Sequence, residues 1–230
     1  MKWNKLLILA VFICTCFICS AQKKYWVHVQ NTIDGKKINI EDGITYTNAN
    51  SEKYTITKLK YYISNVRFIC KGAINKSLKY YLVDAEKKDS FQLSAQSTLC
   101  VGIAFTIGLD SSIQTKGIQY DGALHPLNDM YWAWNSGYVN FKLNGTSTQS
   151  TSINNKIEYH IGGFKDPFKT QRFIQLPLKN LKNKIIIEVA IDKFWSNIKI
   201  AENPITTSPG ALAKKIADNF ENMFSIKNED

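Results

Sequence analysis

Short runs of β-branched and aromatic residues recur along most of this chain, and no long helical pattern separates them. Each run is bounded by Gly, Asn, Asp, Ser or Pro, the residues that commonly end strands and form turns. This spacing predicts an all-β fold, and specifically an antiparallel β-sandwich. The predicted strands cover residues 25–29, 54–70, 79–84, 100–109, 138–143, 156–161, 172–176 and 184–191.

One α-helix is predicted near the C-terminus. Ser208 is placed to cap it, and Pro209 suits its first position because the fixed φ of proline matches a helix. Leu212, Ile216 and Phe220 then recur every fourth residue and form one apolar stripe. We therefore expect a single C-terminal helix that docks on an edge of the sandwich.

The N-terminal segment has the composition of a signal peptide. Lys2 and Lys5 precede an apolar run over residues 6–18, which is short for a membrane-spanning helix, and small residues follow. We predict cleavage after Ala21; acylation of Cys19 is the alternative. No later apolar run predicts a membrane span. The protein is therefore expected in the periplasm, outside the cell or at the cell surface.

Removal of residues 1–21 leaves residues 22–230, which contain no linker, repeat or low-complexity tract and are predicted to form a single domain. The formal net charge of the whole chain is +10. Most lysines are scattered in polar loops rather than aligned on one element, which is typical of a solvated surface. Export also removes most nucleic acids as partners, so we expect no nucleic-acid binding.

Two cysteines remain after removal of the signal peptide. Cys70 and Cys100 form an even pair in a protein expected to reach an oxidising compartment. A disulfide between them would close a loop of about 30 residues and add roughly 3 kcal/mol to stability. The alternative is a pair of buried thiols at strand ends.

Histidine is scarce in this chain, and two of its three histidines lie within predicted strands. Alternation places Trp26 and His28 on the same face of one strand, and places His160 on the face opposite Ile157 and Ile161. Neither histidine is therefore on the more apolar face of its strand. Two imidazoles from different strands can bind one Cu, Zn, Fe or Ni ion, whereas isolated histidines more often serve as hydrogen-bonded structural groups.

The segment from Leu124 to Gly145 concentrates aromatic residues, and Trp132 and Trp134 lie close together in it. On a strand these two indoles would share a face, either within the core or as an exposed pair that stacks on a sugar ring. The chain contains no nucleophile elbow, phosphate-binding loop or zinc-protease motif. We therefore predict that the protein is not an enzyme.

Several segments, taken in order, resemble the MbnP-like copper-binding domain. The most specific is Asn128–Tyr138, NDMYWAWNSGY, which is followed by KLNG at Lys142–Gly145 and by YHIGG at Tyr159–Gly163. The resemblance extends over nearly all of the chain after the signal peptide. The other matching segments are Lys60–Asn65, Leu82–Asp84, Ile107–Asp110 and Ile216–Phe224.

This resemblance implies an exported β-sandwich protein that binds copper through histidines. It also implies a di-haem cytochrome of the MauG type as a partner, which oxidises a tryptophan near the metal to kynurenine. Carried onto this chain, His160 is the best ligand candidate and His28 the next. Trp26 is the tryptophan expected to be modified, with Trp132 or Trp134 as rivals.

Two hypotheses about function are therefore compatible with the sequence. The leading hypothesis is a copper-binding protein for acquisition, storage or delivery, with Cu(I) or Cu(II) held between His28 and His160. The alternative is an interaction module that kept the sandwich and lost the metal, with Trp132, Trp134 and residues 111–124 as its contact surface. A wide separation of the two histidines in space would favour the alternative.

Overall fold

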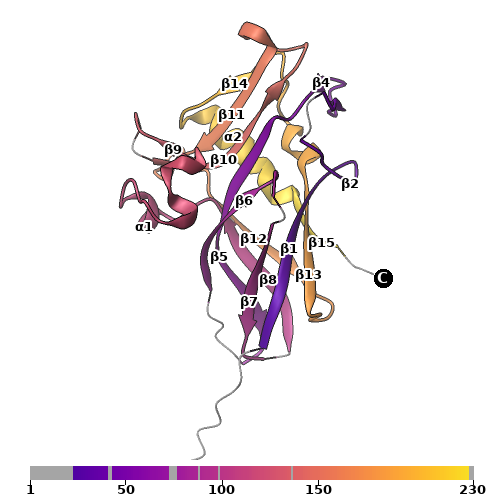
Figure 1. Ribbon diagram of the computed structural model, residues 1–230, viewed down its shortest axis with the longest axis vertical. Helices are drawn as coiled ribbons and strands as arrows, with labels where there is room; N and C mark the ends of the chain where they lie inside the picture. Colours follow the sequence, from indigo (N-terminus) through magenta and orange to yellow (C-terminus); the bar gives the residue numbers. More distant parts are fainter. Residues whose placement is uncertain are drawn as a thin grey trace, which may run out of the picture.

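The computed structural model describes most of the chain that follows the predicted signal peptide, and the signal peptide itself lies outside the described residues. The described residues are 23–40, 43–72, 77–87, 89–97, 99–135 and 137–227. Two β-sheets dominate the molecule (Figure 1), and a small separate hairpin is formed by β3 (Tyr46–Thr47) and β4 (Lys53–Tyr54). The prediction of a mostly β protein is therefore confirmed.

The smaller sheet is built around β1 (Lys23–Ile33). On one side β1 pairs with β13 (Lys184–Ala190), and β13 pairs in turn with β15 (Phe224–Lys227). On its other side β1 pairs with β7 (Ser90–Ala95) and with β2 (Lys36–Lys37). Figure 1 shows β1, β13 and β15 running together along one side of the molecule. Strands from both ends and from the middle of the chain thus share this sheet.

The larger sheet is curled like half of a barrel. Its strands are β5 (Lys58–Cys70), β6 (Leu78–Asp84), β8 (Cys100–Ile107), β9 (Tyr131–Trp132), β10 (Gly137–Thr146), β11 (Lys156–Gly162), β12 (Arg172–Pro177) and β14 (Ile205–Thr206). In hydrogen-bonded order they run β12-β8-β5-β10-β11-β14, with β6 paired to β5 and β9 paired to β10. The strands predicted from the sequence therefore supply most of this sheet.

The two sheets are mixed rather than wholly antiparallel, which corrects the prediction of an antiparallel sandwich. β1 and β13 pair in parallel, and so do β11 and β14. Strands joined by a tight hairpin turn must run antiparallel, but β1 and β13 are far apart in the sequence, so no turn fixes their relative direction. The local pattern of residues could not reveal this pairing.

Two apolar clusters are present, one on each side of the larger sheet. The main core lies between the sheets and takes Val27 from β1 and Tyr159 from β11. The second cluster lies on the outer face of the larger sheet, where Tyr62 is covered by apolar side chains from residues 109–132. That covering segment includes the short helix α1 (Ser111–Gln114), which Figure 1 shows on the side away from β13. The outer face of the larger sheet is therefore partly buried.

The predicted C-terminal helix is present as α2 (Ala211–Asp218), but it begins later than expected. Its N-terminal cap position is Gly210, with no side-chain cap hydrogen bond, rather than Ser208. Ile216 is buried in the main core, as its stripe predicts. The chain then leaves the helix through a 3₁₀ turn at Asn219–Asn222 and forms β15.

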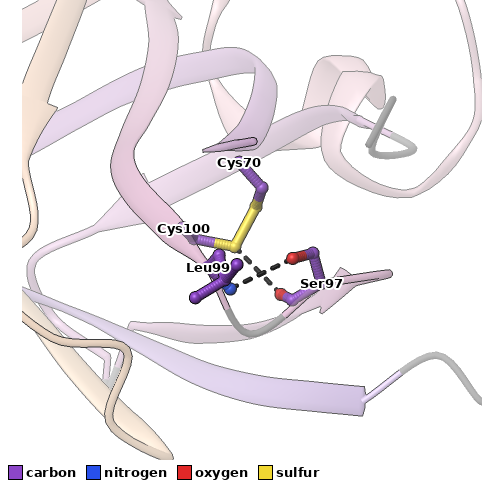
Figure 2. The surroundings of a disulfide bond; sticks show 4 residues. All are labelled: Cys70, Ser97, Leu99 and Cys100. Carbon is purple, nitrogen blue, oxygen red and sulfur yellow. Dashed lines mark hydrogen bonds between the residues drawn. A yellow bond between two sulfur atoms is a disulfide. The ribbon is translucent and has the colours of Figure 1, made fainter. Parts of the chain in front are cut away.

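Cys70 and Cys100 form a disulfide (Figure 2), which is the first of the two alternatives that the sequence left open. The two residues are direct cross-strand neighbours on β5 and β8, with their Cα atoms 3.8 Å apart. In the turn that leads into β8, the backbone N–H of Leu99 donates to the Oγ of Ser97 at 3.0 Å. The disulfide thus closes the segment that contains β6 and β7 into a covalent loop.

Candidate functional site

Trp26 and His28 lie side by side on the outer face of the smaller sheet. Their neighbours on β1, Tyr25 and Val27, are buried in the main core, so strand alternation turns the two ring side chains outward. The indole of Trp26 is 48% exposed, and its ring centroid lies 6.4 Å from that of the half-buried His28. An accessible imidazole and an accessible indole therefore share one surface.

A cavity of about 230 Å³ lies beside His28 and carries positive charge at its edge. Lys37, Lys87 and Lys184 line it together with Asp89. All three lysines are exposed. An exposed lysine can turn its ammonium group into the solvent, where water and salt screen its charge. A metal ion at His28 would therefore meet a screened repulsion.

Asp89 is the acidic side chain of this cavity, and its oxygens are already engaged. Its Oδ2 accepts the backbone N–H of Asp84 at 2.9 Å, and its Oδ1 accepts the hydroxyl of Tyr81 at 3.4 Å. Burial raises the pKa of Asp89 to about 7. Because Asp89 is buried and hydrogen-bonded, the imidazole of His28 is the side chain of this cavity best suited to a transition metal.

His160 lies on β11, on the outer face of the larger sheet. Its Nε2 is 3.0 Å from the Oδ1 of Asn144, within hydrogen-bonding distance. Its cross-strand neighbour Lys142 is buried and forms an ion pair of 3.0 Å with Asp129. Burial and the charges of Lys142 and Lys58 lower the pKa of His160 to about 4. The imidazole is therefore neutral at pH 7, but a bound cation would face an ammonium group that cannot turn into the solvent.

The fold does not bring His28 and His160 together. Val27 beside His28 and Tyr159 beside His160 both point into the main core between the sheets. The two histidines therefore project from opposite outer faces of the molecule, with the core between them. A single ion cannot be held between imidazoles so arranged, which corrects the predicted shared position. Each histidine is a separate candidate ligand.

Trp132 and Trp134 lie beside each other, with their ring centroids 5.7 Å apart, although β9 ends at Trp132. Their burial differs, since Trp132 is only 6% exposed whereas Trp134 is 67% exposed. The benzene edge of the Trp132 indole lies against Gly162, where an added Cβ would come within 2.6 Å of the ring. Trp132 therefore packs inside the protein, and Trp134 alone belongs to the surface.

His125 has a structural role in the turn before β9. Its Nδ1 accepts the backbone N–H of Leu127 at 3.1 Å, and its ring centroid is 5.9 Å from that of Tyr120. The side chain of His125 is thus hydrogen-bonded within its own loop.

The lysines around His28 were not foreseen from the sequence. Lys37 lies on β2, Lys87 follows β6 and Lys184 lies on β13, and these segments meet only through the pairing of the sheet. Gln30, which also lines the cavity, was detectable because it shares the strand phase of His28.

Within the described part of the chain, two features are absent: a cluster of metal-binding side chains and a membrane-spanning helix. Among those residues, no three His, Cys, Asp or Glu side chains are grouped so that they could hold a metal ion. None of the helices in the same residues is long and apolar enough to cross a membrane.

Comparison with known proteins places this mostly β protein in a family. The family model described as MbnP matches residues 22–209, and the chain therefore belongs to the MbnP family. Among solved structures, MbnP from Methylosinus trichosporium is similar, with a TM-score of 0.58 and 11% sequence identity, covering 78% of this chain and 80% of that chain. At this identity the likeness shows a shared fold alone. No curated protein matches the chain.

Proposed function

We propose that this MbnP-family protein binds copper in the periplasm or at the cell surface and serves copper acquisition, storage or delivery without acting as an enzyme. Family membership supports the choice of metal. The observation that carries the choice of site is the adjacent pair of Trp26 and His28 on one accessible face. Imidazole suits both Cu(I) and Cu(II). The Cys70–Cys100 disulfide supports export, because such bonds persist in oxidising compartments.

The charges around the two histidines favour His28 over His160 as the ligand. At His28 the lysines are exposed and screened by solvent. At His160 the neighbouring Lys142 is 4% exposed, and the imidazole is hydrogen-bonded to Asn144. Copper at His160 would have to break that hydrogen bond and lie beside a fixed positive charge. We therefore rank His28 first, which reverses the order drawn from the resemblance.

Trp26 is the proposed substrate of a di-haem cytochrome of the MauG type. Its indole is 48% exposed on the outer face of β1, so a partner can approach the ring without unfolding the strand. Oxidation to kynurenine would place new nitrogen and oxygen donors beside His28. The rivals Trp132 and Trp134 fit less well, since Trp132 is buried and neither has a ring contact with a histidine among the described residues.

The test compares copper bound by the wild type with copper bound by three single variants, all purified from the native host so that oxidation of Trp26 is retained. We expect His28→Ala to lose stoichiometric copper, and His160→Ala and the matched control His125→Ala to retain it. Metal content after loading and dialysis is measured by mass spectrometry. Intact mass of the protein from its native host reports on kynurenine, and the Trp26→Phe variant should lose that mass change. Equal copper content in the wild type and His28→Ala would refute the proposed site.

A second function is favoured by one observation, the separation of the two histidines by the core. Under this alternative the protein is a metal-free interaction module of the cell envelope. Its contact surface would include Trp134 and residues 111–124, but not the buried Trp132. A wild type that binds no copper, together with a native-host partner that is lost in Trp134→Ala, would support the module over the copper protein.

A further inference from the structure

The smaller sheet carries an excess of positive charge around the exposed indole of Trp26. Within the described bounds of its five strands, Glu188 is the one acidic residue. The lysines of the same strands, all of them exposed, are Lys23, Lys24, Lys36, Lys37, Lys184 and Lys227. A cation bound at His28 gains nothing from these ammonium groups. The proposed copper site therefore does not explain the excess of charge.

Strand pairing places three of these lysines around Trp26 and His28. Lys24 shares the strand phase of Trp26 on β1, so it points to the same outer face. Lys184 on β13 is a cross-strand neighbour of Trp26. Lys37 on β2 lines the cavity beside His28. Three separate segments of the chain thus contribute positive charge to one face.

On the larger sheet, by contrast, lysines are paired with carboxylates. The ammonium groups of Lys58 and Lys142 lie 2.9 Å and 3.0 Å from the same carboxylate oxygen of Asp129. The ammonium group of Lys60 lies 3.2 Å from the carboxylate of Asp84. These ion pairs offset the charge of that sheet, whereas a single strand carboxylate cannot offset the lysines of the smaller sheet. The strands of the smaller sheet therefore carry a net positive charge.

The spread of this charge determines the size of what can bind it. Lys24 lies near one end of β1, and Lys37 is the cross-strand neighbour of Thr32 near the other end. At the usual rise per residue, Lys24 and Thr32 are about 26 Å apart along the strand. A small anion cannot contact ammonium groups so far apart, whereas the surface of another macromolecule can.

The apolar content of this face favours a protein over a membrane as that macromolecule. Trp26 is 48% exposed, whereas Ile186, the β13 neighbour of His28, is only 8% exposed. Membrane binding through a surface usually needs several inserted apolar side chains besides positive charge. Gln92 on β7 is the other cross-strand neighbour of Trp26 and is polar. An aromatic side chain surrounded by polar and charged ones is typical of a protein interface.

We infer that the outer face of the smaller sheet is a docking surface for an acidic protein, which the lysines attract to Trp26. Complementary charges speed the encounter of two proteins and orient them, and they suit a transient complex with a small interface. That this acidic protein is the one that oxidises Trp26 rests on the proposed function. The charge of the surface does not.

The probe is a fluorescently labelled polyglutamate peptide of about ten residues, which when extended is long enough to span the face. Its binding to the purified protein is measured by fluorescence anisotropy at low ionic strength, where charges are least screened. The face variant is Lys24→Glu/Lys37→Glu/Lys184→Glu. We expect it to bind the peptide at least about tenfold more weakly than the wild type, because like charges then meet.

The control variant removes the same charge from exposed positions outside the smaller sheet. It is Lys116→Glu/Lys156→Glu/Lys169→Glu. Lys116 follows α1, which lies on the side of the molecule away from β13 in Figure 1. The control should weaken peptide binding by less than about threefold, since distant charges are screened. Both variants should keep the wild-type circular dichroism spectrum, because the replaced side chains are exposed.

The position of the bound peptide is read from the indole N–H resonances in a ¹H–¹⁵N spectrum of recombinant protein. The resonance of Trp26, assigned with a Trp26→Phe variant, should move on addition of the peptide. That of Trp134, which is 67% exposed outside the smaller sheet, should stay. Equal weakening of peptide binding in the two triple variants, or a Trp26 resonance that does not respond, would overturn the inference.

Two further measurements separate this inference from its alternatives. In the native host, the face variant should carry a kynurenine fraction at least about threefold smaller than the control variant, as measured by intact mass. Equal fractions would overturn the inference, whereas a wild type without kynurenine would refute the proposed oxidation and leave the peptide results to decide the docking surface. Binding of the wild type to vesicles of phosphatidylcholine and phosphatidylglycerol, without binding to the peptide, would assign the face to a membrane and overturn the inference.

Discussion

Replacement of His160 by glutamine should change how the stability of the metal-free protein depends on pH. Burial, followed by the charges of Lys142 and Lys58, lowers the pKa of His160 from 6.5 to about 4. The unfolded chain therefore takes up this proton at a higher pH than the folded protein. Stability that is present above pH 6.5 is lost as the pH falls toward 4. Glutamine can still donate to Asn144 but does not titrate, so this loss should disappear.

The size of the effect follows from the two pKa values of His160. They differ by about 2.5, which corresponds to about 3 kcal/mol of unfolding free energy. Asp89 acts in the opposite direction, because burial raises its pKa from 3.8 to about 7. Its contribution is present at low pH and is lost as the pH rises toward 7. The two groups therefore oppose each other over nearly the same range, and the wild type should show a shallow profile.

The assay is urea unfolding at several pH values between about 4 and 7, followed by far-ultraviolet circular dichroism. The His160→Gln variant should lose stability as the pH rises, because the contribution of Asp89 is no longer offset. The Asp89→Asn variant should lose stability as the pH falls, since His160 then acts alone. Parallel profiles for the wild type and His160→Gln would show that His160 is not held neutral, and the reasoning would be wrong.

Two further predictions concern the frame that carries these sites. The Cys70→Ser/Cys100→Ser double variant should lose about 3 to 4 kcal/mol of unfolding free energy, because its unfolded chain has a larger entropy. A reductant should lower the stability of the wild type but not that of the variant. Gly145→Ala should lose about 3 kcal/mol or more, because its Cβ would lie 1.9 Å from the carbonyl oxygen of Thr55. Gly210→Ala is the control and should cost at most about 1 kcal/mol, since nothing lies within 4 Å of its Cβ and only the residue preference of the α2 cap position changes; urea unfolding measures both.

The strands that the sequence predicted best are those whose own residues show the burial pattern. The run Ile185–Ile187 is buried at every position, as expected for a strand covered on both faces. β15 was missed for a physical reason: Phe224 continues the spacing of Ile216 and Phe220, so it fits the helical stripe. Pairing with β13 instead draws residues 224–227 into the smaller sheet. Tertiary pairing there overrides a helical pattern.

The faces of the candidate ligands could be read from the sequence, but their relative positions could not. Strand phase placed His28 and His160 away from the apolar side of their strands, and the structure bears this out. Phase states which side of its own strand a residue occupies, and it does not state which sheet that strand joins. Because β1 and β11 belong to different sheets, two outward histidines lie on opposite faces. The same limit concealed the lysines that gather around His28.

The separation of the histidines makes the proposed modification of Trp26 more important to copper binding. With one imidazole on each face, His28 has no second histidine to share a metal ion. An unmodified indole cannot take that place, because its N–H is only a donor. Kynurenine would instead present an aryl amine and a ketone oxygen beside His28, where Trp26 already lies at a ring distance of 6.4 Å. Under the proposed function, oxidation of Trp26 is therefore the step that turns a single imidazole into a copper site.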